Sequence, residues 1–258
     1  MEIDTTRPNA GRIYDYFLGG SHNFEADRIA AEQLLALIPS ARGGARLNRW
    51  FMYDVVERLM QSGFDCFLDL ATGLPTEGYI HDLAPDARVL YNDFDPVTVA
   101  YGREIIGDKP NVRYLQANIT DIGAILRAAA EHFGAQRRIA ICFIGVTYFF
   151  DDATLQPILD QMYEWCAPGS KMALSWLAGE ADDVARFQSS QFAAMYQRLN
   201  SPVYARNLEN VRAMLAKWRM DEPGLLPLSE WNGVEQWRTD GGIEEAPLDL
   251  YGVIVTKE

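Results

Sequence analysis

One segment near residue 70 constrains the fold of this chain more than any other. Residues Phe67–Pro75 read Phe-Leu-Asp-Leu-Ala-Thr-Gly-Leu-Pro, a short apolar run that contains one acid and then breaks at Gly73. About twenty residues further on, a second apolar run, Arg88–Tyr91, leads to Asp93 and Asp95. A strand, a glycine turn, a helix and a second strand ending in an acid form the pattern of a nucleoside-binding βαβ unit. The pattern predicts the kind of ligand and leaves its use open.

Beyond residue 63 the pattern alternates between apolar runs and helical periodicity. The predicted strands are Cys66–Leu70, Ala87–Tyr91, Val112–Gln116, Ile139–Ile144, Lys171–Trp176 and Leu248–Thr256, with a short strand at about Leu226–Trp231. The predicted helices between them are Thr76–Leu83, Val97–Ile106, Ile122–Phe133 and Ala153–Cys166. Continuous apolar strands separated by helices predict an α/β fold with a mostly parallel sheet covered by helices on both faces. The last strand follows a loop instead of a helix, so it is expected to have a hairpin partner and to form an antiparallel edge of the sheet.

The first 62 residues are predicted to form a helical cap that belongs to the same domain as the core, residues 63–258. Two helices are expected there, at Asp27–Leu37 and at about Ala45–Gln61. The aromatic-rich segment Arg12–Phe24, broken by two glycines, is expected to lie over another part of the molecule. A helical insertion is predicted at about residues 180–222, as two stretches, with Asn207 as the N-cap of the second.

Charge and cysteine content limit the classes of partner. The chain has 258 residues and a net charge of −13, which disfavours nucleic acid because such binding depends on Lys and Arg neutralising phosphates. Arg42, Arg46 and Arg49 would share a helix face and offer an anion site, although a solvated face is the expected use. A small molecule is the expected partner, and the oligomeric state stays open.

The cellular setting is predicted from the cysteines and from the absence of long apolar runs. The three cysteines lie in or beside apolar segments and show neither a disulfide nor a zinc pattern, so we expect no metal and a reducing, cytoplasmic compartment. No apolar run reaches the ~18 residues of a membrane span. The polar N-terminus does not resemble a secretory signal.

Polar side chains at three successive strand ends indicate how a nucleoside would be held. Asp69 can accept hydrogen bonds from loop amides or a ligand ammonium group, and Gly73 lets the backbone approach a ligand. Asp93 or Asp95 is placed to accept both ribose hydroxyls. Asn118, after the third strand, offers a donor and an acceptor to an adenine edge.

The loop after the first strand argues against a dinucleotide. A pyrophosphate cradle requires G-x-G-x-x-G, whereas this loop keeps one central glycine, and Pro75 removes an amide donor. A Walker phosphate loop is also absent from the sequence. The ligand is therefore predicted to be a nucleoside without a polyphosphate, and an NAD-dependent oxidoreductase is the disfavoured alternative.

The chain resembles the Rossmann-like methyltransferases that use S-adenosylmethionine, and more narrowly a bacterial family of such proteins, well known from actinobacteria, without an assigned substrate. The resemblance spans nearly the whole chain and rests on Arg12–Gly20, Asn23-Phe24, Asp27-Arg28, Asn48-Arg49, Phe67–Thr76, Asn92–Pro96 and Tyr251–Val255. It implies a Rossmann-like sheet of seven strands, mostly parallel with an antiparallel last strand, and the helical N-terminal cap. Two departures are notable: the glycine-rich loop is reduced to Gly73, and Asn118 stands where many methyltransferases carry Asp.

The resemblance also implies S-adenosylmethionine as the cofactor and a role for each matching residue. The methionine part would be lined by Asp69, Ala71, Thr72 and Gly73, with Thr76 in the same motif. Asp93 would hold the ribose, with Asp95 beside it, and Phe94 would flank the adenine. Asn118 and the amide of Ile119 would bind the adenine edge, and Gly145–Tyr148 would border the methyl group.

The function predicted on this basis is methyl transfer to an unidentified, small-molecule acceptor. The alternatives are a non-catalytic protein that binds S-adenosylmethionine or S-adenosylhomocysteine, and a structural scaffold. No catalytic base is identified; the candidates are Tyr14, His22 and Tyr148. A base is optional in this chemistry because the donor is already activated and the protein mainly aligns the nucleophile.

Overall fold

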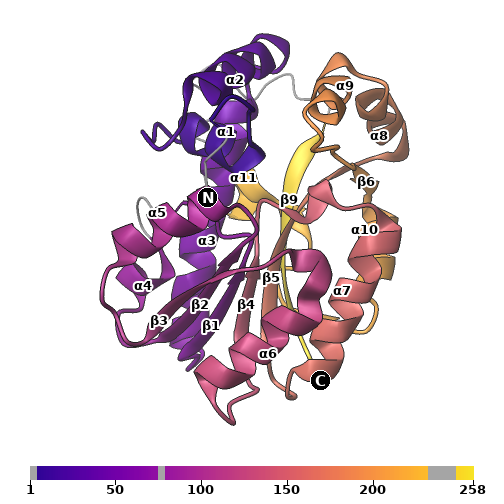
Figure 1. Cartoon of the computed structure of the whole chain (residues 1–258). Helices are drawn as coiled ribbons and strands as arrows, with labels where there is room; N and C mark the ends of the chain where they lie inside the picture. Colours follow the sequence, from indigo (N-terminus) through magenta and orange to yellow (C-terminus); the bar gives the residue numbers. More distant parts are fainter. Residues whose placement is uncertain (1–4, 75–78, 232–247) are drawn as a thin grey trace.

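The segment predicted as the first strand, Cys66–Leu70, forms β1 at the centre of the sheet (Figure 1). The computed structural model describes residues 5–74, 79–231 and 248–258. Within these ranges the main path through the sheet runs β3-β2-β1-β4-β5-β9-β7, while β6 pairs with β5 and β8 with β9. Pairing is parallel from β3 to β5, and β9 is antiparallel to its neighbours. The predicted Rossmann-like sheet, mostly parallel with an antiparallel last strand, is confirmed, although the described residues form nine strands instead of the seven expected.

The remaining strands are β2 Arg88–Asp93, β3 Val112–Gln116, β4 Ala140–Phe143, β5 Lys171–Gly179, β6 Arg206–Asn207, β7 Arg219–Met220, β8 Leu226–Pro227 and β9 Asp249–Thr256. The helices are α1 Ala10–Phe17, α2 Glu25–Leu37, α3 Ala41–Gln61, α4 Ile80–Leu83, α5 Pro96–Ile106, α6 Ile122–Phe133, α7 Asp152–Trp165, α8 Ala181–Gln188, α9 Gln191–Arg198, α10 Leu208–Met214 and α11 Leu228–Trp231, with 3₁₀ turns η1 Ile119–Asp121 and η2 Thr147–Phe149.

Alternating side chains of the central strands build two apolar layers. Leu68, Leu70 and Leu90 pack with α6, α7 and α10 on one face of the sheet. Phe67 and Val89 pack with α3, α4, α5 and α11 on the other. Since successive residues of a strand point to opposite faces, a fully apolar strand requires cover on both sides, and helices supply it.

The N-terminal helices have two different positions. α3 packs along a sheet face through the stripe Leu47, Phe51, Val55 and Leu59, so it belongs to the core layers. α1 and α2 lie above the carboxyl ends of the parallel strands, beside α8 and α9 of the insertion (Figure 1). An apolar cluster that includes Ile13, Leu34 and Met195 joins α1 and α2 to α9. The roof over the strand ends is thus made by segments far apart in the sequence.

The insertion and the approach to the last strand differ from the sequence-based expectation. The described residues of the insertion form three helices, α8, α9 and α10, instead of two, and Asn207 caps α10 as predicted. The strand predicted at about Leu226–Trp231 is a two-residue strand followed by α11. β9 lies between β5 and β7 and not at the edge of the sheet, because Arg219-Met220 pairs outside it.

A buried ion-pair network joins the cap to the core. Arg12 is 3% exposed; its Nε donates to Asp27 Oδ2 at 2.8 Å, and its NH1 lies 3.5 Å from Asp95 Oδ2. Asp27 is fully buried and accepts from the amides of Asn9 and Phe24 as well. The network connects α1, α2 and the start of α5, and it gives the sequence motif of Arg12 and Asp27 a structural role.

Removing the cation of this network is expected to destabilise the protein strongly. Arg12→Met leaves the Asp27 carboxylate buried without its cation, and the free energy of unfolding should fall by about 3–5 kcal/mol. Urea denaturation followed by circular dichroism measures this change. Arg113→Gln, which breaks the exposed pair with Glu131, is the control and should cost at most about 1 kcal/mol. Similar losses in the two variants would contradict the role assigned to Arg12.

Candidate active site

A cavity of about 460 Å³ lies at the carboxyl ends of the parallel strands, under the roof of helices. β1 and β4 are adjacent at the centre of the sheet although they are not consecutive in the chain, so the direction of the strand order reverses between them. Open α/β sheets bind ligands at such a switch point. The lining residues come from the ends of β1, β2, β3 and β4, and from α1, α3, η2 and α9.

The loop after β1 is held by side chains from other elements. Gly73 N donates to Asp93 Oδ2 at 3.0 Å, and Gly73 O accepts from the Tyr114 hydroxyl. The Tyr79 hydroxyl lies within hydrogen-bond distance of the carbonyl oxygens of Thr72 and Leu74. Ala71 and Gly73 both have positive φ, 51° and 69°. The backbone of the loop therefore turns sharply at the cavity, as predicted for Gly73.

Asp93 is positioned for a vicinal diol. Its Oδ2 accepts from Gly73 N, and its Oδ1 accepts from Asp95 N at 2.9 Å. A carboxylate has about four lone-pair sites, so each oxygen keeps one for a ligand in the cavity that Asp93 lines. Burial raises the pKa of Asp93 to about 6, against the hydrogen bonds from Asp95 and Gly73 that lower it.

The groups expected to read an adenine lie together at the ends of β2 and β3. Asn118, Ile119 and Phe94 all line the cavity. Phe94 is 60% exposed, the most exposed of the large apolar side chains described, and it offers a ring face to a ligand. Asn118 Oδ1 accepts from Thr120 N at 3.0 Å and from Thr120 Oγ1 at 2.9 Å, so it caps η1. Of the donor and the acceptor that Asn118 was expected to offer, only the amide donors are left for a base.

Opposite charges meet at the floor of the cavity. Asp69, at the end of β1, is 5% exposed, and burial raises its pKa to about 7. Arg49, on α3, lies with its guanidinium 4.6 Å from the centroid of the Tyr79 ring and donates to the Tyr79 hydroxyl at 3.4 Å. Both side chains line the same cavity, and Arg49 lowers the pKa of Asp69 in opposition to burial. The pair suits a ligand that carries an ammonium and a carboxylate.

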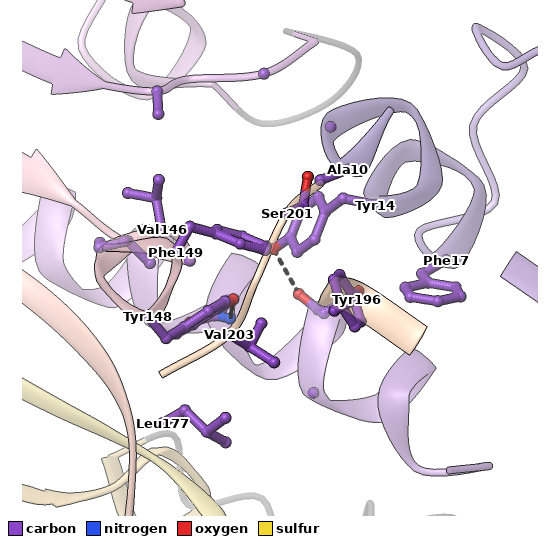
Figure 2. Close-up of a pocket in the computed structure, with 18 of the residues that line it drawn as sticks. Ala10, Tyr14, Phe17, Val146, Tyr148, Phe149, Leu177, Tyr196, Ser201 and Val203 are labelled. Atoms are coloured by element: carbon purple, nitrogen blue, oxygen red, sulfur yellow. Dashed lines mark hydrogen bonds between the residues drawn. The ribbon is translucent and has the colours of Figure 1, made fainter. Parts of the chain in front are cut away.

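The other half of the cavity is aromatic and aliphatic. Figure 2 shows Tyr14, Tyr148 and Phe149 around one space, with Tyr196 and Leu177 nearby. Arg206, 3% exposed, donates to the carbonyl oxygens of Thr147 and Phe150 and pairs with Asp152 at 2.7 Å, which fixes η2. η2 in turn presents Tyr148 and Phe149 to the cavity.

The two tyrosines predicted as candidates lie in the cavity but are held as neutral phenols. The Tyr14 hydroxyl donates to Ala45 O at 2.9 Å, and burial raises its pKa to about 12. Burial also raises the pKa of Tyr148 well above its usual value, and its hydroxyl lies 3.5 Å from Asn48 Nδ2. Neither hydroxyl is ionised near neutral pH, so neither is set up as a general base.

Two other predicted residues, His22 and Asp95, are not brought into the cavity lining. The His22 ring packs edge-on against Tyr101, with 5.3 Å between ring centroids. The Asp95 side chain caps α5 through the amide and hydroxyl of Thr98 and pairs with Arg12, so it supports the site from outside. Thr76 lies outside the described residues. No group of three or more His, Cys, Asp or Glu within the described ranges could hold a metal ion.

Three residues of the cofactor end have no role there that the sequence predicts: Arg49, Tyr79 and Tyr114. Arg49 was grouped with Arg42 and Arg46 on a solvated face, but Arg42 lies near Glu32 at 3.9 Å and Arg46 is exposed, while Arg49 lines the cavity. The motif Asn48-Arg49 was the only available signal for it. The tyrosines support the loop by hydroxyl-to-carbonyl contacts that leave no sequence pattern.

The fold and these contacts define a Rossmann-like protein that binds a nucleoside cofactor carrying an amino-acid group. A family model for S-adenosyl methyltransferases matches residues 1–257, and the chain belongs to this family. It is an S-adenosylmethionine-dependent methyltransferase, and the expectation for cofactor and enzyme class is confirmed.

Solved structures agree with this assignment. A proposed methyltransferase from Thermobifida fusca is 27% identical, with a TM-score of 0.88 over 99% of this chain and 97% of that one. A DUF574 family protein from Streptomyces avermitilis is 26% identical, with a TM-score of 0.87 over the full length of both chains. The plantazolicin methyltransferase BpumL shares the fold at 11% identity and a TM-score of 0.56, over 96% of each chain. No curated protein sequence gives a significant match to this chain.

The residues present fit S-adenosylmethionine. The methionine ammonium and carboxylate match Asp69 and Arg49, the ribose diol matches the free lone pairs of Asp93, and the adenine matches Phe94 and Asn118. Gly145, with φ +78°, lies two residues after β4 and lines the cavity, and a side chain there would contact Asn48. These assignments of single residues are predictions that binding measurements can test.

Cofactor affinity is expected to depend on the protonation of Asp69. Its pKa of about 7 means that the unliganded carboxyl is largely protonated below that pH, and the ammonium of the ligand requires the ionised form. The affinity for S-adenosylhomocysteine should therefore rise with pH between 6 and 7.5, by up to about tenfold per unit below the pKa. Calorimetry in buffers of different ionisation enthalpy should detect proton release. Asp69→Asn controls for titration of the ligand amine; an unchanged pH slope in that variant would rule Asp69 out.

Arg49 is expected to bind the methionine carboxylate. Arg49→Gln should weaken S-adenosylhomocysteine binding by about 10- to 100-fold, because a charge-assisted contact is lost. The affinity for 5′-methylthioadenosine, which lacks the amino-acid group, should not change. Arg46→Gln, an exposed position one turn earlier on α3, is the matched control. Equal losses for both ligands would show that Arg49 acts on the loop through Tyr79 and not on the carboxylate.

Proposed function

We propose that this methyltransferase acts on a small, flat and largely apolar molecule, which it binds in the aromatic half of the cavity. The observation that supports this most directly is the enclosure of that half by Tyr14, Phe149 and Tyr196, which come from three different elements, α1, η2 and α9. An aromatic lining with few polar groups suits a small hydrophobic ligand.

Methyl transfer from this cofactor requires little chemical catalysis by protein side chains. S-adenosylmethionine supplies a methyl group on a sulfonium, so the protein has to align the acceptor and keep water away. Electron-rich ring faces also favour a nearby cation. The aromatic side chains of α1 and η2 are placed for both roles, and the neutral tyrosine hydroxyls do not compete as nucleophiles.

The charge distribution supports a small-molecule acceptor over nucleic acid, because a net charge of −13 opposes contact with phosphates. No helix in the described part of the chain is long and apolar enough to cross a membrane. Cys66, Cys142 and Cys166 are all free and buried, which is consistent with a reducing compartment. We infer that the protein works in the cytoplasm of a bacterium, as the sources of its 26–27% identical relatives suggest.

A labelling experiment tests the proposal. The full chain is incubated with tritiated S-adenosylmethionine and an extract of a bacterium that encodes a member of this family. Label should appear in a compound below about 1 kDa that partitions into organic solvent, and Asp93→Asn should abolish it by weakening the cofactor site. Label found only in protein or RNA would refute a small-molecule acceptor. Cofactor binding without any labelling would favour the non-catalytic alternative.

A further inference from the structure

Three buried side-chain oxygens of the cavity lining lack a hydrogen-bond partner among the described residues: Asp15 Oδ1, Asn48 Oδ1 and Asn92 Oδ1. Asn92 belongs to β2, at the cofactor end, and Asp15 belongs to α1, whereas Asn48 lies on α3 apart from the groups that fit the cofactor. Asn48, on α3, is 1% exposed and lines the cavity. Its Nδ2 contacts the Tyr148 hydroxyl at 3.5 Å, whereas its Oδ1 is buried and accepts no hydrogen bond from the described residues. A buried carbonyl oxygen without a donor is rare and unfavourable. The unpaired oxygen therefore indicates a ligand that brings a donor.

Asn48 stands where the two halves of the cavity meet. A Cβ built on Gly145, two residues after β4, would lie 3.7 Å from Asn48 Nδ2 and 3.8 Å from the Tyr148 hydroxyl. β4 pairs directly with β1, whose last residues line the methionine end. On α3, Asn48 follows Ala45, which binds the Tyr14 hydroxyl, and precedes Arg49. A donor bound to Asn48 would thus sit between the cofactor end and the aromatic half.

The same region offers no general base. Among the described residues that line the cavity there is no His, Lys, Glu or Cys. Burial raises the pKa of Tyr14, Tyr148 and Tyr196. A nucleophile used here must carry a reactive lone pair at neutral pH without first losing a proton.

Three carboxylates of the described residues line the cavity, and none of them forms a hydrogen bond with Asn48. Asp69 and Asp93 lie at the cofactor end. Asp15 Oδ2 accepts from His22 N and Asn23 Nδ2. Its Oδ1 accepts no hydrogen bond from the described residues and would lie only 2.0 Å from a Cβ at position 20. Asp15 therefore holds the turn after α1, which also explains why position 20 is glycine.

We propose that the methyl acceptor is a neutral aryl amine whose N–H donates to Asn48 Oδ1 while its ring packs among the aromatic side chains. The proposal rests on the proposed function and names its substrate class. In the transfer, the nitrogen lone pair forms the new N–C bond as the C–S bond breaks, and the bonding pair stays on sulfur as a neutral thioether. The surplus proton on nitrogen passes to water afterwards, so no protein base is required. Asn48 is a substrate-binding residue that fixes the direction of the lone pair.

Three bicyclic probes separate the recognition of N–H from that of the ring. 2-Naphthylamine carries the N–H donor, 2-(dimethylamino)naphthalene lacks it, and 2-naphthol replaces it with O–H. Their binding to the full chain saturated with S-adenosylhomocysteine is measured by calorimetry or ligand-observed NMR. The amine should bind about tenfold more tightly than its dimethyl analogue. Asn48→Leu, of similar size, should remove this preference and keep the affinity for S-adenosylhomocysteine.

Asp54→Asn, which alters a surface ion pair with Arg58 on the same helix, is the control and should keep the preference. A preference that persists in Asn48→Leu would be steric and would overturn the role of Asn48. Failure of all three probes to bind would overturn the aryl-amine assignment. Failure of S-adenosylhomocysteine itself to bind would instead refute the cofactor site, so the two failures are distinguishable.

Turnover with labelled S-adenosylmethionine tests the nucleophile. The amine should be methylated and the hydroxyl compound should not, because its O–H has no base to remove the proton. Comparable methylation of 2-naphthol, or no turnover of the bound amine, would overturn the assignment of nitrogen as the nucleophile.

Discussion

The position of the helical roof over the cavity depends on one buried guanidinium, that of Arg12. Arg12 contacts carboxylates from two other parts of the chain, Asp27 on α2 and Asp95 at the start of α5. Such burial is costly unless every charge is compensated, and here backbone amides complete the shell of Asp27 while Thr98 does so for Asp95. Since Asp95 also donates its amide to Asp93, the same network sets the cap above the sheet and the acid that fits the ribose.

The cofactor loop shows how a methyltransferase site is built with few glycines. Instead of several glycines, Ala71 adopts a left-handed conformation at a cost of roughly 1 kcal/mol or more. Such strain persists only where the surroundings fix it, and hydroxyls from Tyr79 and Tyr114 hold the carbonyls of the next residues. Tyr114 belongs to β3 and Tyr79 precedes α4, so the loop is tied to the sheet on both sides.

Elements that depend on local sequence patterns could be predicted, whereas elements that depend on contacts between distant segments could not. β1 and α6 were predicted with their observed bounds, because continuous apolar runs and helical periodicity are local signals. The two-residue strands β6 and β7 were not predicted, and β8 was predicted as a longer strand, because the pairing of all three depends on where distant strands lie. The same holds in the site. Asp69 and Asp93 follow strand ends and were predicted, whereas Arg49 enters the cavity only because α3 packs along the sheet.

The two halves of the cavity are therefore specified in different ways. The cofactor end consists of strand ends whose positions follow from the sheet, so a short motif is enough to identify it. The acceptor end is formed where α1 and α2 pack against α9, through Ile13, Leu34 and Tyr196. This apolar contact closes the cavity from above and lowers its polarity, which strengthens every electrostatic contact inside. Bulk water does not reach the unpaired amide oxygen of Asn48 in this enclosed cavity. Asn48 therefore discriminates between acceptors with and without an N–H donor more strongly than an exposed amide would.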